Sequence, residues 1–179
     1  SPGTGLKLPF EGEPLLGFSQ KRLGDYQGSG FQFSFERINN NTAARLKLGI
    51  TFIENEESVY HSLGINNITD DLWTMVTVVY NGTQLKIYEN ENLREQANVI
   101  GIVDWSTIAN SSFYVGRYID SPMFGSFFSG QMRNVGLWNN SVSSDGILKI
   151  YNQGMKFNPL IESGSYQLSD DLLGFWKMN

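Results

Sequence analysis

The sequence predicts an all-β domain in which two antiparallel sheets pack face to face. Three observations predict this class. Aromatic residues are abundant, with 12 Phe, 8 Tyr and 4 Trp in 179 residues, and such side chains favour the pleated, half-buried surface of a sheet. Short segments alternate apolar with polar residues, which is typical of antiparallel strands with one wet face. The 19 Gly fit an architecture with many tight turns.

The strongest local signal is a hairpin in the middle of the chain. Trp73–Tyr80 is rich in β-branched residues, and Thr83–Tyr88 follows after Asn81 and Gly82. Asn-Gly predicts a type I′ turn, because both residues tolerate a positive φ angle. One face of the hairpin is expected to be buried, because the second strand alternates Leu85 and Ile87 with Gln84, Lys86 and Tyr88.

Other segments with the same alternation are expected to complete the two sheets. They are Gly30–Glu36, Ala44–Ile50, Ser112–Arg117, Gly130–Trp138 and Leu172–Met178. The tryptophans Trp73, Trp138 and Trp176 fall inside these expected strands and are predicted to be core residues.

One short helix is predicted near residues 144–153. Ser143 can accept a hydrogen bond from an early backbone N–H, and Asp145 suits the positive end of the helix dipole. Ile147, Ile150 and Tyr151 lie on one side at helical spacing and are expected to face the core. Gly154 is suited to end the helix, because glycine adopts positive φ angles without strain.

Charge and composition exclude several classes of function. The net charge of −5 and the scattered 13 Lys and Arg disfavour nucleic acid and anionic membranes as partners. The absence of cysteine excludes disulfides and thiolate metal sites. No apolar run approaches the ~18 residues of a membrane span, so membrane insertion is not expected. Residues 1–5 are predicted to be a linker or processing scar, and residues 6–179 a single domain.

Seven segments resemble, in order and spacing, the pattern of laminin G-like domains in the concanavalin A-like lectin/glucanase superfamily. They are Phe10–Gly12, Phe31–Phe35, Trp73–Tyr88, Phe113–Arg117, Phe128–Asn139, the helix ending at Gly154, and Leu173–Trp176. The resemblance implies a jelly-roll sandwich, frequent calcium binding, and frequent binding of glycans or protein partners. It also implies an extracellular, cell-surface or virion-surface location.

The chain departs from this family pattern at the usual calcium ligand. Arg133 stands where the family often has an Asp, and Asn134 follows where a Glu is common. A guanidinium cannot ligate Ca²⁺, which prefers several oxygen ligands including carboxylates. We therefore expect no cofactor, although the Asn134 carbonyl keeps calcium possible.

The sequence lacks the carboxylate run with which glycosidases on this fold cleave sugars. The nearest run comprises Glu54, Glu56 and Glu57, which we interpret as a solvated hairpin tip. The single histidine, His61, comes without a nucleophile motif and is expected to be exposed or structural. The domain is therefore predicted not to be an enzyme.

Adjacent aspartates stand before two expected strands, Asp70-Asp71 and Asp170-Asp171. We expect them to make local turn hydrogen bonds rather than to bind a metal ion.

Glycan binding rests on an aromatic ring against the apolar face of a sugar, with polar groups on its hydroxyls. Residues 117–124 mix such side chains in a segment that is expected to join two strands. The alternative is that the aromatic rings cap the sandwich or meet a neighbouring subunit. The candidate ligand-binding residues are Tyr26, Trp105, Arg117, Tyr118, Asp120 and Phe124.

The leading hypothesis is a non-catalytic recognition or adhesion module that binds a glycan or a protein partner, as part of a larger surface or virion protein. A second hypothesis is a structural or assembly domain of a capsid, tail fibre or surface layer, held in a homo-oligomer or larger assembly. A third is a glycoside hydrolase or lyase.

Overall fold

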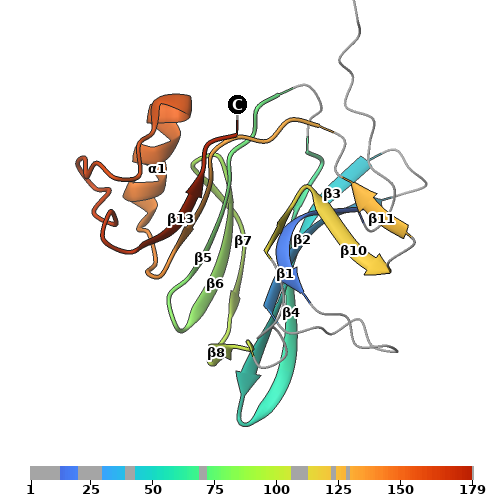
Figure 1. Cartoon of the computed structure of the whole chain (residues 1–179). Helices are drawn as coiled ribbons and strands as arrows, with labels where there is room; N and C mark the ends of the chain where they lie inside the picture. The colour runs from blue at the N-terminus through green and yellow to red at the C-terminus, as the bar shows by residue number, and fades with distance from the viewer. Residues whose placement is uncertain are drawn as a thin grey trace, which may run out of the picture. The chain divides into compact units, whose positions relative to one another are not determined.

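The computed structural model describes residues 13–19, 30–38, 43–68, 72–105, 113–121, 124–127 and 130–178 (Figure 1). The chain divides into two compact units. The first comprises Ser1–Leu72 and Val99–Gly130, and the second comprises Trp73–Asn98 and Gln131–Asn179. Residues 1–5 lie outside the described ranges, and the single domain over residues 6–179 stays a prediction.

The first unit is built on one antiparallel sheet with the strand order β4-β3-β2-β1-β9, and β8 pairs with β3 (Figure 1). Strands β10 and β11 form a separate antiparallel hairpin that lies against β1. The strands of this unit are β1 (Glu13–Ser19), β2 (Gly30–Ile38), β3 (Ala43–Glu54), β4 (Glu57–Asn66), β8 (Ile102–Val103), β9 (Tyr114–Val115), β10 (Arg117–Ser121) and β11 (Phe124–Phe127).

The predicted apolar face of β2 and β3 is confirmed, although the opposite face is not uniformly wet, because Ser34 and Thr51 are also buried. Phe33 pairs with Leu48, and Leu48 pairs on its other side with Leu63 of β4. All three side chains are buried, as expected where every second residue of a strand faces the same side. Phe52, which follows Leu48 by four residues along β3, is fully buried on the same face.

The predicted strand Ser112–Arg117 is instead two short strands. Gly116, with a φ angle of 72°, lies between β9 and β10 and sends them to different partners, β1 and β11. A positive φ angle is disfavoured within a regular strand, so the alternation in the sequence concealed a turn.

The second unit contains the antiparallel sheet β5-β6-β7, the pair β12-β13 and the helices. Its elements are β5 (Val76–Tyr80), β6 (Gln84–Glu89), β7 (Asn92–Asn98), β12 (Val135–Trp138), α1 (Ser144–Gln153), the 3₁₀ helix η1 (Gly154–Lys156) and β13 (Leu172–Trp176). Three predicted strands are thus shorter than expected: β5 begins at Val76, β12 begins at Val135, and β13 ends at Trp176.

Helix α1 confirms the predicted helix and both of its ends. Ser143 accepts a hydrogen bond on its side chain from the backbone N–H of Gly146 (3.1 Å). Gly154 has a φ angle of 52°, and its N–H bonds the carbonyls of Ile150 and Tyr151. These contacts satisfy backbone groups that a helix otherwise leaves unpaired at its termini.

Helix α1 packs on the β5-β6 face through Ile147, which is fully buried against Val79 and Tyr88. The predicted division of β6 into one buried and one wet face is therefore wrong at Tyr88. Tyr88 lies on the face opposite Leu85 and Ile87, yet all three are buried. The physical reason is that the helix covers the second face of the sheet at this position.

The turn between β5 and β6 differs from the predicted type I′ turn. Only Gly82 has a positive φ angle, 93°. Asn81 instead accepts hydrogen bonds on its side-chain oxygen from the N–H groups of Thr83 (3.1 Å) and Gln84 (2.8 Å). An Asn side chain can thus replace a backbone turn contact. The paired positive φ angles of a type I′ turn occur at Asn55 and Glu56, between β3 and β4.

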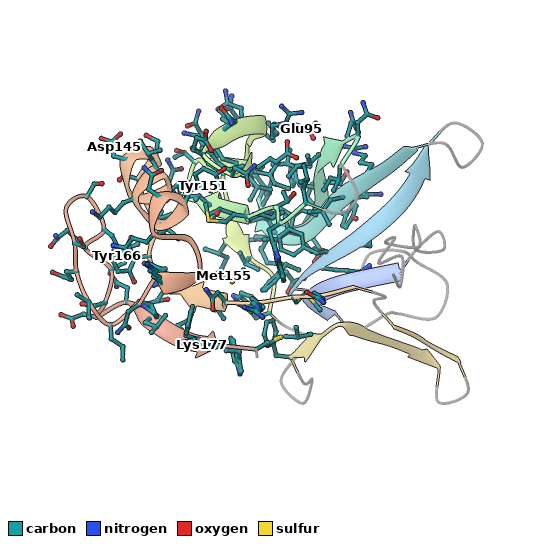
Figure 2. All side chains as sticks on the ribbon, turned by 90° about the horizontal axis from the view of Figure 1, so that it is seen from above. Glu95, Asp145, Tyr151, Met155, Tyr166 and Lys177 are labelled. Carbon is teal, nitrogen blue, oxygen red and sulfur yellow. The ribbon has the colours of Figure 1, made fainter. Side chains whose placement is uncertain are left out.

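An aromatic cluster links β12, β13 and the loop between η1 and β13 in the second unit. The indole N–H of Trp138 donates to the Tyr166 hydroxyl (2.9 Å), which donates to the carbonyl of Pro159 (2.9 Å). The ring of Phe157 stands edge-on to Tyr166, with centroids 5.0 Å apart, and meets Phe175 at 6.4 Å. Figure 2 labels Tyr166 among these side chains.

The expectation of a core position is wrong for Trp73 and Trp176. Trp73 is 51% exposed and precedes β5 instead of lying within it. Trp176 is 41% exposed, because Phe175 takes the face of β13 that meets the aromatic cluster. Its ring folds back over Gly174, where a Cβ atom would stand 2.6 Å from the ring. Trp138 is half-buried in the aromatic cluster.

We predict that Ile147→Ala lowers the free energy of unfolding by about 2–4 kcal/mol, because it leaves a cavity against Val79 and Tyr88. Leu148→Ala is the matched control. Leu148 neighbours Ile147 on the same helix but is exposed, so its change is expected within about 0.5 kcal/mol. Urea unfolding measures both. Equal effects of the two variants would contradict the packing of α1 on this sheet.

We predict that Tyr166→Phe lowers the free energy of unfolding at pH 7 by about 1–3 kcal/mol, because Trp138 and Pro159 lose their hydrogen-bond partner. Burial raises the pKa of Tyr166 above its ordinary value of 10.0; the hydrogen bond from Trp138 opposes the rise, and the negative charge of Glu162 adds to it. The unfolded chain therefore ionises this tyrosine first. The Tyr166 hydroxyl therefore stabilises the fold fully below pH 10. This contribution is lost as the pH rises from 10 through the pKa that Tyr166 has in the folded state.

The stability difference between the parent and Tyr166→Phe should accordingly narrow above pH 10 in urea unfolding. Tyr151→Phe is the control, because Tyr151 is exposed on α1; it should leave stability at pH 7 within about 0.5 kcal/mol. A difference that stays constant from pH 7 to beyond pH 10 would argue against the raised pKa.

Candidate functional site

The segment that carries Trp105 is anchored by its neighbour Asp104 in the first unit. The N–H of Asp104 donates to the carbonyl of Thr51 (2.8 Å), and its carbonyl accepts from the N–H of Gly30 (2.7 Å). The Ser58 hydroxyl donates to the Asp104 carboxylate (2.9 Å). Asp104 is buried. Through these three hydrogen bonds it connects β2, β3 and β4 with the residues that follow β8.

Trp105 itself is exposed over 46% of its surface. Its ring stands edge-on to Phe31, with centroids 6.3 Å apart and an interplanar angle of 82°. Phe31 also meets Phe113, with centroids 6.4 Å apart. Edge-to-face packing of this kind fixes the orientation of a ring. The structure therefore presents one large aromatic surface to solvent on a supported backbone.

Four other candidates lie on the β10-β11 hairpin, which begins four residues after Phe113. Residues 117–124 were expected to be a segment between strands, but Arg117–Ser121 form β10 and Phe124 begins β11. Register pairs Arg117 with Phe127 and Tyr118 with Ser126. Asp120 lies at a register shift between Ile119 and Ser121, and Ser121 pairs with Phe124.

The structure therefore gathers four of the six candidate residues, Arg117, Tyr118, Asp120 and Phe124, on one hairpin, whose backbone alone it describes. The contact of Phe31 with both Trp105 and Phe113 links Trp105 to the segment that leads into this hairpin. Tyr26 lies outside the described residues.

The acidic run at the β3-β4 turn and His61 form a structural pair. The side chains of Glu54 and His61 hydrogen-bond across the two strands, and the ring of His61 stands edge-on to Phe52, 5.7 Å between centroids. Glu56 and Glu57 are exposed, as predicted for a solvated hairpin tip. A histidine held in this way reinforces the hairpin.

Of the two aspartate pairs, the structure describes Asp170 and Asp171. The contacts of Asp171 are both local, from its N–H to the carbonyl of Leu168 (3.3 Å), and across to the end of β12. The backbone carbonyl of Asp171 accepts from the N–H of Asn139 (2.8 Å) at the end of β12, and Asp170 is exposed. Asp70 and Asp71 lie outside the described residues. In the ranges that the structure describes, no three His, Cys, Asp or Glu side chains come together in a way that would hold a metal ion.

Arg133, which stands at the usual calcium position of the family, does not fit the ion. The guanidinium of Arg133 donates from Nη1 to the sulfur of Met155 (3.0 Å). Its Cζ lies 5.7 Å from the centroid of the Trp73 ring. A guanidinium offers only donors, whereas calcium requires oxygen acceptors. The neighbouring Asn134 keeps calcium possible, and the expectation of no cofactor stays a prediction.

The contact between Trp73, Arg133 and Met155 was not predicted. The sequence suggested a core position for Trp73 and pointed to Arg133 only as a missing metal ligand. No spacing signal could have found the group, because its members come from three segments far apart in the chain: before β5, before β12, and within η1.

None of the helices within the described ranges combines the length and the apolar character that a membrane span requires.

Comparison with known proteins now identifies the family. The sequence matches the laminin G-type model described as the concanavalin A-like lectin/glucanases superfamily over residues 17–148, which is most of the chain. The comparison with curated proteins finds no match. Laminin G-like domains often bind carbohydrates or proteins, are generally non-catalytic and are typically extracellular.

The match and the structure confirm the predicted class, which is mostly β with antiparallel sheets and one short helix, consistent with a concanavalin A-like sandwich. The chain belongs to the concanavalin A-like lectin/glucanases superfamily.

Proposed function

We propose that this domain is a non-catalytic recognition module that binds a glycan through Trp105 and the β10-β11 hairpin. The observation that carries the proposal is the exposed ring of Trp105, held edge-on by Phe31. Such a ring offers flat apolar surface without a large loss of rotamer freedom on binding. Sugars present a matching apolar face of C–H groups, and neighbouring polar groups can take their hydroxyls.

The acidic side chains support a role without catalysis. Glycoside hydrolysis uses two carboxylates that flank the scissile bond. Glu54 is already hydrogen-bonded to His61, and Glu56 and Glu57 stand exposed at the hairpin tip. These positions offer no enclosed pair for an acid and a base.

The family background supports a place outside the cell, since laminin G-like domains are typically extracellular. We therefore place the module on a cell or virion surface, as part of a larger surface protein, where glycans are the most abundant partners.

We predict that Trp105→Ala weakens the affinity for a glycan selected on an array by at least about tenfold, the scale of losing an aromatic anchor of about 2 kcal/mol. Calorimetric titration measures it. Ile100→Ala is the control, because Ile100 is an exposed apolar residue of the same segment; it should leave the affinity unchanged. Circular dichroism checks that both variants are folded.

An unchanged affinity of Trp105→Ala would show that the glycan binds at another place on the domain. An array without any bound saccharide would remove the glycan hypothesis and leave a protein partner.

A further inference from the structure

We propose that Arg133 is the centre of a second ligand site, in the second unit, that binds an anionic sugar residue. The anionic group of the sugar would contact the guanidinium of Arg133, and the apolar face of the sugar would contact Trp73. This site is independent of Trp105, which belongs to the first unit. Residues Trp73, Arg133 and Met155 are called the arginine site below.

Two neighbouring groups, an aromatic ring and a thioether sulfur, hold the Arg133 side chain in place. Its guanidinium lies over the Trp73 ring, 5.7 Å from Cζ to the centroid, a distance at which the cation is attracted by the ring. On another side, Nη1 donates to the sulfur of Met155 (3.0 Å). A long side chain that is already ordered loses less rotamer freedom when a ligand binds.

Hydrogen-bonding capacity remains on the guanidinium. It carries five N–H donors in a planar fork, and a thioether sulfur is only a weak acceptor. Arg133 is exposed, as are Trp73 at 51% and Met155 at 47%. The site therefore presents a polar fork between an aromatic and a thioether surface, open to solvent (Met155 is labelled in Figure 2).

The part of the chain that the structure describes gives Arg133 no countercharge, because no carboxylate within it comes within 4.0 Å of the Arg133 guanidinium in an ion pair. Arg94 in the same unit shows the contrast, because it pairs with Glu89 at 3.3 Å. Among the described residues, an aromatic ring and a sulfur are thus the contacts of the Arg133 guanidinium, and an anionic ligand would supply the opposite charge.

The fork geometry favours a planar carboxylate, which an arginine binds with two parallel hydrogen bonds. A uronic acid residue combines that carboxylate with an apolar C–H face for Trp73. A sulfated sugar shares the anionic chemistry. The chain as a whole carries a net charge of −5, so recognition would rest on contact at this site and not on long-range attraction.

Calorimetric titration with three probes tests the arginine site: an oligogalacturonate, its fully methyl-esterified form, and a sulfated galactan oligosaccharide. The ester keeps the sugar and removes the charge. We expect the oligogalacturonate to bind at least about tenfold more tightly than its ester, the scale of hydrogen bonds to a charged group.

Three variants locate the binding. Arg133→Gln should weaken oligogalacturonate binding at least about tenfold. The affinity of Arg133→Lys should lie between those of the parent and Arg133→Gln, since lysine keeps the charge but loses the planar pair of N–H donors. Arg94→Gln is the matched control and should bind as the parent does, because its arginine already has a carboxylate partner. Thermal unfolding checks that all variants keep the parent's stability, as expected for exposed positions.

The possible results of these titrations distinguish the arginine site from binding elsewhere. Preference for the sulfated probe, lost in Arg133→Gln, would support the site and assign the anion to sulfate. Equal binding of acid and ester, undiminished binding in Arg133→Gln, or no binding of either anionic probe at millimolar concentration would overturn it. Loss of binding in Trp105→Ala alone would place the anion in the first unit and likewise overturn this proposal, while leaving the proposed function intact.

Discussion

Burial of one row of apolar side chains fixes the register of the long strands β2, β3 and β4. The paired row of Phe33, Leu48 and Leu63 is buried in all three strands. A slip of one residue would turn each of these side chains to the opposite face, so the register is strongly specified. The same register places Thr51 and Ser58 where Asp104 binds them. The position of Trp105 thus depends on the apolar pattern of strands to which it does not belong.

The two units present exposed tryptophans by different physical means. Trp105 is oriented by another aromatic ring, Phe31, and by the hydrogen-bonded backbone of Asp104. Trp73 instead carries a guanidinium over its ring. The first arrangement offers an aromatic surface supported by a second ring, whereas the second couples an aromatic surface to a positive charge. Such differences in local chemistry, and not the shared fold, decide what a domain of this family recognises.

Sequence reasoning succeeded where one local pattern determines one element. Alternation predicted β2 and β3, and a capping serine with a terminal glycine predicted both ends of α1. It failed where a distant segment decides. Tyr88 was assigned to a wet face because nothing nearby in the sequence shows that α1 covers it. Strand β7 escaped notice because most of its residues are exposed and polar. The arginine site escaped for the same reason as Tyr88, since its three residues meet only in the folded chain.

Native-state hydrogen exchange shows whether the sheet β2-β3-β4 holds the Trp105 segment rigidly through Asp104. The amides of Asp104 and Gly30 are both donors in this connection. We expect these two amides to exchange only with the global opening that also exposes the amides of β3. Exchange at the rate of an exposed loop, while β3 remains protected, would contradict this expectation, because Trp105 would then sit on a segment that moves independently of the sheet.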